Sequence, residues 1–512
     1  MTKIAACLTY YNESLNAVLS SIITTQYAAN FAGVELDIYL ILDGREAAHK
    51  DVLERAGGDF FDTATLETLT TVRYMFADNS LRYLNDSFFV ASKPLDWDSR
   101  KACQSCQSYD NNNMSVIPLI KDENKGKQDS IKLFYKAIKA TKRYDYTIHM
   151  DTGSLPARDT IYRMVNRISE ENIAGVASNM TAVPDFSGFT LTEWQRFDYQ
   201  AQTLINLAAG DVAGRINVLP GCFSLYDYNV ISKIINNKHD EGFGQILAHL
   251  AEDRLYCHEI VVYDHNKRFV YESKADVYID PCHTSKEFLW QRRRWVGAEF
   301  ISMLCSVGDA FKGEAPKRYV LSAIPQLVFS WFCPGVLSSV FIYLLTHGGT
   351  IANIFSGLGL VGLTGLIASS AYGPNIFTRI SISAVALSSA FLLITGIVFH
   401  TPLASIAMVA MMIKRPNFLF YLLLCLPVRV STITYALINI GDMSWGTKGK
   451  VTDNSNLKFP AKVIVLMFMV SNVFLILAPY TITLIILGIS IIGAAIIGLF
   501  SLCYHAKRIH IR

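Results

Sequence analysis

The feature of this sequence that most constrains its fold is a long charge-poor stretch in its second half. Charged residues are so rare there that a run of this length must face lipid, because the core of a bilayer takes about 20 apolar residues per helix. Residues 1 to 318 hold most of the acids and bases. We therefore expect a soluble domain at 1–318 and a transmembrane domain at 319–512. From Tyr319 to Trp445 the only charged residues are Arg379, Lys414, Arg415, Arg429 and Asp442.

The overall charge limits the partners of the chain. The net charge is +3 and no block of like charges occurs, so the sequence gives no indication of a nucleic-acid partner. The segment Met1 to Tyr10 lacks the long apolar region of a cleavable secretion signal. The first domain is therefore expected in the cytosol, and the whole chain is expected to be an integral membrane protein.

Six apolar stretches in the second domain predict transmembrane helices. An even number of spans places the polar loop 441–458 on the cytosolic side, in agreement with Lys448, Lys450 and Lys458 in that loop. The segment 401–413 is too short to cross a bilayer alone and stays ambiguous. The predicted spans are 319–346, 351–371, 379–399, 417–440, 461–480 and 482–503.

Strands and helices alternate at the start of the first domain. Short apolar runs at 4–9, 36–42 and 146–150 predict buried strands, and apolar residues at helical spacing follow the first run and recur at 131–138. Alternation of this kind predicts an α/β domain with a mostly parallel sheet.

Two aspartates come directly after predicted strands. Asp43 follows 36–42, and Asp151 follows 146–150. Ligands of open α/β sheets bind beyond the carboxyl ends of the strands. A carboxylate at this edge can hold a divalent ion that neutralises a diphosphate leaving group, although a strand-end aspartate more often serves as a local cap. We expect Asp151 to bind Mg or Mn.

Two segments could form helices lying on a membrane surface, near 191–207 and 296–313. The first mixes Trp194, Phe197 and Tyr199 with polar residues. A helix on the surface of the soluble domain explains the first pattern almost as well, so both interpretations stay open.

An acidic pair and a basic–aromatic cluster are candidates for chemistry. Transfer of a sugar to a hydroxyl group needs a base, which Asp253 in Glu252-Asp253-Arg254 could supply. In the run 291–295, QRRRW, arginine can meet the growing charge of a pyrophosphate and tryptophan offers a flat face to a sugar ring. Taken singly, the first is a solvated helix face and the second a basic cluster near lipid head groups.

Two further patterns lie in the second domain. The run 444–449, SWGTKG, forms a polar loop between predicted spans. Gly357, Gly359 and Gly362 spell GxGxxG within an apolar span and without a preceding strand. We interpret these glycines as sites of close helix packing rather than as a nucleotide-binding loop.

In this order, the segments resemble those of the chitin synthases within the processive glycosyltransferases. QRRRW following EDR is the specific part, and the resemblance covers about residues 4 to 450. Ser154 stands where D-x-G-T has Thr, and Leu42 stands before Asp43 where Ser is usual. The matching segments are Tyr11-Asn12-Glu13, Asp43-Gly44-Arg45, Lys127-Gln128-Asp129-Ser130, Asp151-Thr152-Gly153, Leu219-Pro220-Gly221-Cys222-Phe223-Ser224, Glu252-Asp253-Arg254, Gln291 with Arg294-Trp295, and the SWGTKG run.

This resemblance implies a GT-A-type α/β domain followed by an all-α transmembrane channel of about six helices. It implies processive, inverting transfer of N-acetylglucosamine from UDP-N-acetylglucosamine to a growing chitin chain, in the plasma membrane. The implied catalytic residues are Glu252, Asp253, Gln291, Arg294 and Trp295. The implied UDP-binding residues are Glu13, Asp43, Lys127, Asp129, Asp151 and Arg294, and the residues near the acceptor or channel are Trp295, Gly221, Cys222 and Trp445.

Two other functions stay open. A hyaluronan synthase shares QxxRW and a WGT loop, but those enzymes usually carry membrane helices before the catalytic domain. A non-catalytic membrane transporter that only binds nucleotide sugars is the alternative from another class, and the joint presence of Asp151, Asp253 and Arg294 argues against it. A homo-oligomer is also open, and no residue by its chemistry selects the N-acetyl group.

Overall fold

The computed structural model describes most of the chain, apart from several loops and single positions. The described residues form two compact units that interleave along the sequence. Unit 1 comprises Met1–Val183, Ile216–Lys238 and Tyr256–Asp280, and unit 2 comprises Pro184–Arg215, His239–Leu255 and Pro281–Arg512. The described ranges are 1–43 without 12 and 14, 67–69, 72–75, 81–84, 88–90, 114–120, 126–141, 144–183, 190–237, 242–370, 376–394, 418–442 and 458–509.

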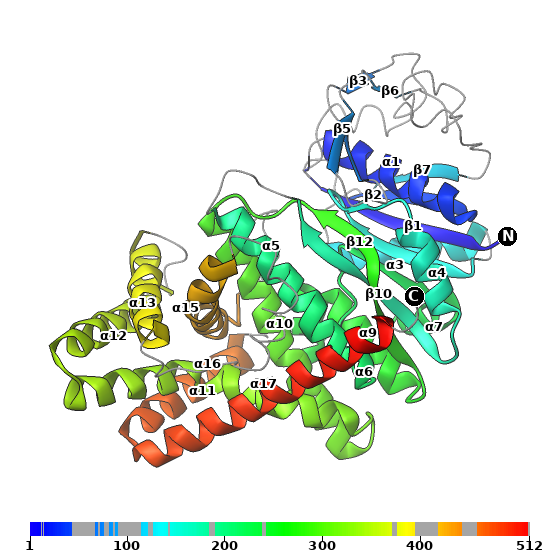
Figure 1. Cartoon of the computed structure of the whole chain (residues 1–512). Coiled ribbons are helices and arrows are strands. Elements are labelled where there is room, and N and C mark those ends of the chain that lie inside the picture. Colours follow the sequence, from blue (N-terminus) through cyan, green and yellow to red (C-terminus); the bar gives the residue numbers. More distant parts are fainter. Residues whose placement is uncertain are drawn as a thin grey trace. The chain divides into compact units, whose positions relative to one another are not determined.

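Unit 1 is built on one sheet of eight strands in the order β7-β2-β1-β8-β11-β10-β12-β9 (Figure 1). The strands predicted at 4–9, 36–42 and 146–150 are confirmed as β1, β2 and β8. Two small antiparallel pairs lie apart from this sheet, β3 Glu67–Leu69 with β6 Phe88–Val90 and β4 Val72–Met75 with β5 Leu81–Leu84. The strands of the large sheet are β1 Lys3–Tyr10, β2 Glu35–Leu42, β7 Met114–Ile120, β8 Tyr146–Asp151, β9 Leu155–Pro156, β10 Ile173–Ala182, β11 Phe223–Asp227 and β12 Arg268–Ile279.

The sheet is mostly parallel, as predicted, with β11 and the short β9 running in the opposite direction. Strands β7, β2, β1 and β8 run parallel to one another, whereas β11 pairs antiparallel with both β8 and β10. β10 and β12 also pair in parallel. Alternation of strands and helices favours parallel neighbours, whereas the direction of β11 depends on which strands it meets.

Helices cover both faces of this sheet. On one face, Met150 shares a core with Val18 and Ile22 of α1 (Leu15–Ala32), and α4 (Thr160–Ile168) packs beside α1. Successive side chains of a strand point to opposite faces. His149 accordingly contacts Tyr135 of α3 (Lys127–Thr141) on the other face.

α7 (Tyr228–Ile234) lies beside α3 on that second face, where Tyr228 stacks on Tyr135. The helix predicted at 131–138 is therefore confirmed as part of α3. The sheet lies between these two helical layers. Because β1, β2 and β8 are parallel neighbours, their carboxyl ends lie at the same edge of the sheet.

Unit 2 is mostly helical. Its helices outside the long apolar set are α5 Leu191–Ala201, a π-helical turn η3 Gln202–Leu207, α6 Ala208–Val212, α8 Gly242–Leu250 and α10 Ser285–Lys312. The helix α9, Glu252–Tyr263, contributes its first residues to this unit. A core of apolar side chains joins α8 and α10 to the long apolar helices, and it includes Leu247, Phe300, Phe341, Leu437 and Phe468.

The aromatic residues that suggested a membrane-surface helix at 191–207 lie in the interior of unit 2. Trp194 and Phe197 pack with Phe288 and Tyr421. Their burial against protein shows that these side chains are not themselves a lipid-facing surface. The interfacial position of the whole segments, 191–207 and 296–313, stays a prediction.

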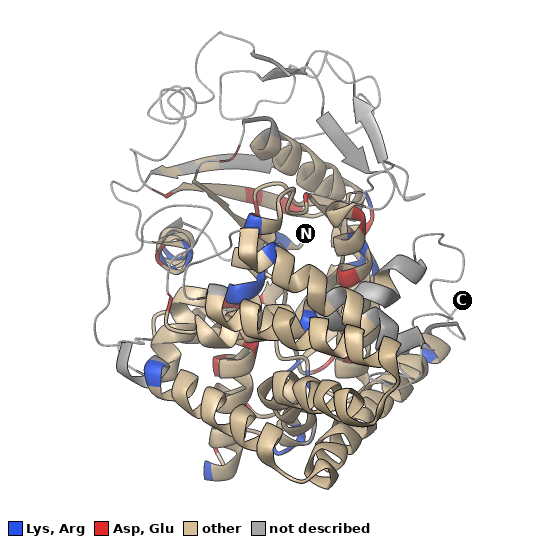
Figure 2. Cartoon of the chain, turned by 90° about the vertical axis from the view of Figure 1, so that its left-hand side faces the viewer, with Lys and Arg blue, Asp and Glu red and all other residues tan. Residues whose placement is uncertain are grey.

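All six predicted apolar segments contain helices in the structure. Among the described residues, three are long and apolar enough to cross a membrane: Arg318–His347, Thr350–Ala368 and Tyr480–Lys507. The segment 401–413 lies outside the described residues. In Figure 2 most of the helical ribbon is tan, with few segments coloured for Lys, Arg, Asp or Glu. The helices are α11 Arg318–His347, α12 Thr350–Ser370, α13 Ile376–Ile394, α15 Phe418–Ile438, α16 Lys458–Leu477 and α17 Tyr480–Ile509.

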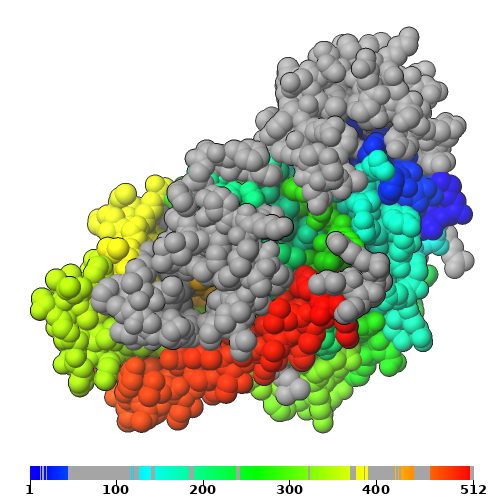
Figure 3. Space-filling model, viewed as in Figure 1, coloured from blue at the N-terminus to red at the C-terminus, as the bar shows by residue number. Residues whose placement is uncertain are grey.

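α17 presents large apolar side chains at the molecular surface. It forms a continuous ridge in the space-filling view (Figure 3). Ile485, Ile492 and Leu499 expose 63%, 62% and 52% of their surface. A row of exposed aliphatic side chains of this kind fits contact with lipid better than contact with water.

The GxGxxG glycines are confirmed as packing positions at two of their three sites. A Cβ atom on Gly359 would lie 2.4 Å from the ring of Phe341, and one on Gly362 would lie 2.9 Å from the backbone of Ser381. These glycines let α12 approach α11 and α13 closely. Gly357 has open space around it.

A side-chain amide replaces one backbone hydrogen bond of α11. Pro325 and Pro334 lie inside this helix. The Gly335 N–H donates to Asn472 Oδ1 of α16 at 2.8 Å, and Asn472 Nδ2 donates to the Trp331 carbonyl at 2.8 Å. Because Gly335 and Trp331 stand one helical turn apart, the amide of Asn472 occupies the place of their normal hydrogen bond.

Candidate functional site

The proposed donor residues of unit 1 lie at the edge where parallel strands end. Asp43 comes one residue after β2, and its N–H donates to the Tyr10 carbonyl at the end of β1 at 2.9 Å. Glu13 follows β1, and its carboxylate accepts from the Tyr11 N–H at 3.0 Å. The register between the two strands thus brings residues from YNE and DGR to one edge. Asn12, Gly44 and Arg45 lie outside the described residues.

Lys127 and Asp151 form an ion pair at the same edge. Lys127 is the first residue of α3, and its Nζ lies 2.7 Å from Asp151 Oδ1 at the end of β8. The lysine side chain is 11% exposed, whereas that of Asp151 is 46% exposed. Asp129 lies in the first turn of α3, where the helix dipole stabilises a carboxylate.

The turn after β8 explains why glycine occupies position 153. Gly153 has φ +91°, a conformation that strains residues with a side chain. Its N–H donates to Ser21 Oγ at 2.9 Å, and Thr152 Oγ1 donates to the Thr9 carbonyl at 2.8 Å. These bonds fix the turn to α1 and β1. An aspartate at position 153, in addition to Asp151, would be strained by the positive φ.

The LPGCFS segment reaches this turn from a distant part of the chain. The Asp151 N–H donates to the Cys222 carbonyl at 3.0 Å, because β11 pairs with β8 directly beyond this point. Ser224 Oγ donates to the Pro220 carbonyl at 2.6 Å and closes the turn around Gly221. Gly221 and Cys222, expected near the acceptor, thus lie in unit 1 beside Asp151.

A buried histidine lies two residues before Asp151. His149 Nε2 is 3.0 Å from Tyr135 Oη, which is also 2.8 Å from Thr147 Oγ1. Burial, with a smaller contribution from Lys127, lowers the pKa of His149 to about 3. The imidazole is therefore neutral at physiological pH and serves as a packed hydrogen-bonding group beneath the site.

The carboxylate at the end of β8 fits a metal site that a nucleotide helps to build. The described part of the chain contains no group of three or more His, Cys, Asp and Glu side chains suited to hold an ion. Mg²⁺ commonly uses one or two carboxylates together with water and substrate phosphates. Asp151 therefore fits an ion held mainly by the phosphates of a nucleotide.

The proposed base belongs to unit 2. Glu252 and Asp253 open α9, and both lie in its first turn. Glu252 is buried, while Asp253 is half-buried and accepts from the Arg254 N–H through Oδ1 at 2.8 Å. The N-terminal end of a helix favours the ionised carboxylate. The partly accessible group of the pair is therefore Asp253.

The QRRRW run lies within one long helix, α10. A capping box starts this helix: Thr284 Oγ1 accepts from the Glu287 N–H, and Glu287 Oε2 accepts from the Thr284 N–H, each at 3.2 Å. Such a box fixes where the first turn begins. Gln291, Arg294 and Trp295 are half-buried, one to two turns further on.

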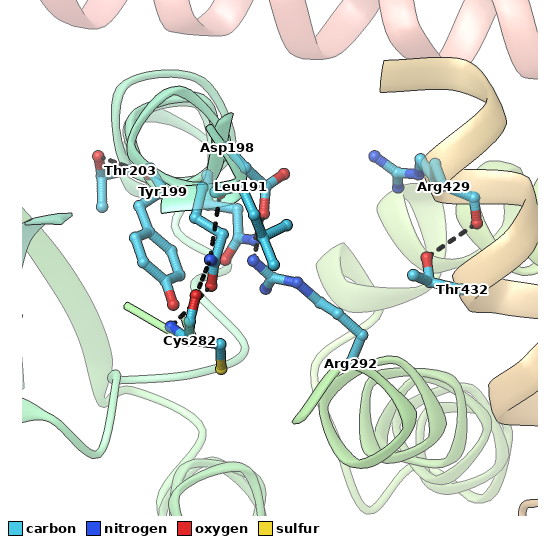
Figure 4. A network of polar contacts seen from close by, with 10 residues as sticks. Leu191, Asp198, Tyr199, Thr203, Cys282, Arg292, Arg429 and Thr432 are labelled. Atoms are coloured by element: carbon cyan, nitrogen blue, oxygen red, sulfur yellow. Dashed lines mark hydrogen bonds and ion pairs between the residues drawn. The ribbon is translucent and has the colours of Figure 1, made fainter. Parts of the chain in front are cut away.

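The two central arginines of the run are held in ion pairs within unit 2. Arg292 lies 2.6 Å from Asp198 Oδ2 of α5 (Figure 4). Arg293 pairs with Asp442, and burial lowers its pKa to about 10, so the guanidinium stays charged at neutral pH. The sequence contained no signal for either partner, because Asp198 and Asp442 belong to none of the matched segments.

Tyr199 and Trp295 complete an aromatic cluster around Arg292. The Tyr199 ring lies 5.8 Å from that of Trp295, and burial raises the pKa of the Tyr199 hydroxyl, opposed in part by Arg292 and Gln291. Trp445 lies outside the described residues, as does the rest of the SWGTKG run. Asp442 is the last described residue before that run.

Comparison with known families gives the class of the protein first. Residues 4–310, more than half of the chain, match the model of a chitin synthase-like glycosyltransferase domain. The chain belongs to this family of chitin synthase-like glycosyltransferases. The matched region includes both the strand-end carboxylates of unit 1 and the QRRRW run of unit 2.

Similar proteins carry the name chitin synthase at modest identity. Chitin synthase 7 of Cryptococcus neoformans var. grubii is 25% identical over 378 residues, which cover 64% of this chain and 40% of that one. Chitin synthase C of Aspergillus oryzae is 26% identical over 266 residues, covering 46% and 29%. The chain thus spans less than half the length of these relatives.

A solved structure is similar over most of the chain at low identity. It is the mannosyltransferase PcManGT from Pyrobaculum calidifontis in complex with GDP-Man and Mn2+. It covers 84% of this chain and 85% of its own, with 11% identity and a TM-score of 0.43.

Proposed function

We propose that this glycosyltransferase is a membrane-embedded chitin synthase with a GT-A-type domain. It transfers N-acetylglucosamine from UDP-N-acetylglucosamine to the 4-hydroxyl of a growing β-1,4 chain. The observation that carries the proposal is the group formed by Asp43, Lys127 and Asp151 at the edge where parallel strands end. This edge is the ligand-binding position of open α/β sheets, and it lies within the family match.

The donor would be bound by residues of unit 1. Asp43, with Glu13, Lys127 and Asp129, would hold the uridine part. Asp151 would help to hold Mg or Mn, which supplies neutralisation of the diphosphate charge when bound. Lys127, 2.7 Å from Asp151 and little exposed, adds a fixed positive charge next to that carboxylate.

The acceptor would be handled by residues of unit 2. Asp253 accepts the proton of the 4-hydroxyl group as the new bond from that oxygen to the anomeric carbon forms. The bond from the anomeric carbon to the diphosphate oxygen breaks with inversion, and the leaving UDP keeps the electron pair. Gln291 and Arg294 would position the diphosphate and acceptor, and Trp295 would stack on the terminal sugar.

The polymer would leave through the membrane helices, with residues 1–318 in the cytosol, and Gly221, Cys222 and Trp445 near the acceptor or channel. Six spans predict that a tag placed after Arg512 is on the same side as Met1. Protease protection of the two termini in sealed vesicles measures this. Cleavage of the two tags from opposite sides would contradict an even number of spans.

One assay tests the proposed activity. The purified full-length protein in lipid is supplied with UDP-N-acetylglucosamine and Mg or Mn, and the polymer is identified by its digestion with chitinase or hyaluronidase. We expect a chitinase-sensitive product that requires the metal and is lost in EDTA. A product formed only when UDP-glucuronate is also supplied would indicate a hyaluronan synthase. Binding of UDP-sugar without any transfer would indicate a non-catalytic protein.

A further inference from the structure

A buried ion pair joins α5 to the QRRRW helix within unit 2. Arg292 Nη2 lies 2.6 Å from Asp198 Oδ2, and the two side chains expose only 6% and 19% of their surface (Figure 4). A buried guanidinium loses its hydration, so it is retained only where a counterion and further contacts compensate. Asp198 supplies that counterion.

Three aromatic rings surround the same guanidinium. Its Cζ atom lies 4.5 Å from the centroid of the Trp295 ring, 4.9 Å from that of Phe288 and 5.4 Å from that of Tyr199. Cation–π contacts are directional, because the cation favours the face of the ring. The position of Arg292 therefore restricts the rotation of the Trp295 indole.

α5 is fixed by contacts other than the ion pair. Gln195 Nε2 donates to the Cys282 carbonyl at 2.8 Å, and the Cys282 N–H donates back to Gln195 Oε1 at 3.2 Å. This two-way amide contact ties α5 to the segment that leads into α10. Asp198 thus presents its carboxylate from a helix that has its own attachment.

The end of the same helical segment is held by α17. The carbonyl of Leu204, in the π-helical turn η3, lies 2.8 Å from Ser501 Oγ and 3.0 Å from His505 Nε2. These two contacts attach the π-helical turn to α17. With Gln195 and Leu204 both held, Asp198 has little freedom to follow Arg292 if the latter moves.

We propose that Asp198 is a positioning residue for Trp295 that acts through Arg292. The carboxylate fixes the guanidinium, the guanidinium fixes one face of the indole, and the indole keeps the orientation needed to stack on a sugar. This proposal rests on the proposed function only in its last step, the acceptor role of Trp295. The class of ligand is thus a pyranose ring presented by its apolar face.

The first experiment measures the indole itself and needs no activity. The full chain is labelled with fluorotryptophan, and the Trp295 signal is assigned by its loss in Trp295→Phe. In Asp198→Asn, which keeps the shape but removes the charge, the Trp295 fluorine resonance should shift and broaden. In Asp198→Glu it should return toward the wild-type position. The control is Asp309→Asn, which removes an acid that pairs with exposed Lys312 on the same helix, and it should leave the Trp295 signal unchanged.

A Trp295 signal identical in wild type and Asp198→Asn would overturn the positioning role. If Asp198→Asn does not fold, Arg292→Lys provides the second test, since it keeps the charge but loses the planar group. The same displacement of the Trp295 signal is expected there. An unmoved signal in folded Arg292→Lys would equally overturn the proposal.

The second experiment links the position of the indole to catalysis. Per folded molecule, Asp198→Asn should raise the apparent KM for a chitooligosaccharide acceptor about tenfold, the loss expected for roughly one stacking contact. The KM for UDP-sugar should stay within about twofold of the wild type. A residue with a merely structural role would lower the folded yield and leave both constants unchanged, which would overturn the link. Absence of transfer by the wild type itself would instead overturn the proposed function, and the fluorine result would still decide the positioning.

Discussion

Asp151 in unit 1 leaves 46% of its side chain exposed, whereas Arg292 and Arg293 in unit 2 expose 6% and 2%. The first charge lies at a strand end, where a ligand can reach it. The other two are enclosed by protein and held by Asp198 and Asp442. The comparison separates two uses of charge within the matched segments: the proposed binding of substrate at the sheet edge, and the attachment of helices around the QRRRW run.

This difference also divides the QRRRW run itself. Arg292 and Arg293 are engaged with acidic partners on other elements, while Gln291, Arg294 and Trp295 keep part of their surface accessible. Removing the counterion of a buried arginine lowers the stability of the fold. A half-exposed arginine contributes little to stability and is accessible to a substrate. We therefore expect substitutions at the two kinds of position to fail in different ways.

The largest effect is expected for the proposed base. Asp253→Asn keeps the shape of the side chain but removes the proton acceptor, so turnover should fall by about 100-fold or more. Single-turnover transfer and UDP-sugar binding are measured side by side, and binding should stay nearly unchanged. Near-normal polymer formation by the variant would show that another group takes the proton.

The next effect compares matched acids in the two units. Asp442→Asn leaves the buried Arg293 short of its counterion and should lower stability by about 2 kcal/mol. Asp151→Asn, at a half-exposed carboxylate, should cost less than about 0.5 kcal/mol in stability while impairing UDP-sugar binding. Denaturation in detergent measures both. Equal losses of stability in the two variants would contradict the distinction between buried charges that attach helices and accessible charges that bind substrate.

The third effect concerns pH and is specific to unit 1. The folded pKa of His149, about 3, lies below the ordinary value of 6.5, so the unfolded chain takes up the proton first. The contribution of this buried neutral ring is complete above pH 6.5 and is lost as the pH falls toward 3. Lowering the pH from 7.5 to 5.5 should therefore reduce the free energy of unfolding by about 1.4 kcal/mol through His149.

The His149 effect is the difference between wild type and His149→Gln in denaturation experiments at both pH values. Arg293, with its pKa of about 10, stays charged throughout this range and adds no such dependence from unit 2. An identical pH dependence in the two proteins would mean that the buried ring is protonated in the folded state.

The smallest effect compares two glycines. Gly153→Ala forces a side chain into a positive φ and should cost about 1 kcal/mol. Gly357→Ala, in α12, has no neighbouring atom within 4 Å of the new Cβ and should be neutral or stabilising by up to about 1 kcal/mol. If Gly153→Ala is tolerated as well as Gly357→Ala, the turn after β8 is not restrained by its backbone.

Much of the fold could be predicted from local patterns. The apolar runs at 4–9, 36–42 and 146–150 are strands of a sheet that is covered on both faces, so successive side chains are all buried. Asp43 and Asp151, which come at the ends of two of these runs, therefore lie at the edge of the sheet. The apolar stretches after 318 contain helices for a similar reason. The chemistry-bearing segments were also recognisable, since each is short and contiguous.

The tertiary structure alone decided which distant residues meet. No periodicity announces that β11 runs antiparallel beside β8, that Cys222 accepts from Asp151, or that Asp198 and Asp442 neutralise the central arginines. A local pattern records whether a side chain is buried, since burial follows from the period of a helix or strand. The partner of a buried charge depends on how whole helices and strands pack. The attraction between two such charges becomes strong only when packing buries both side chains next to each other.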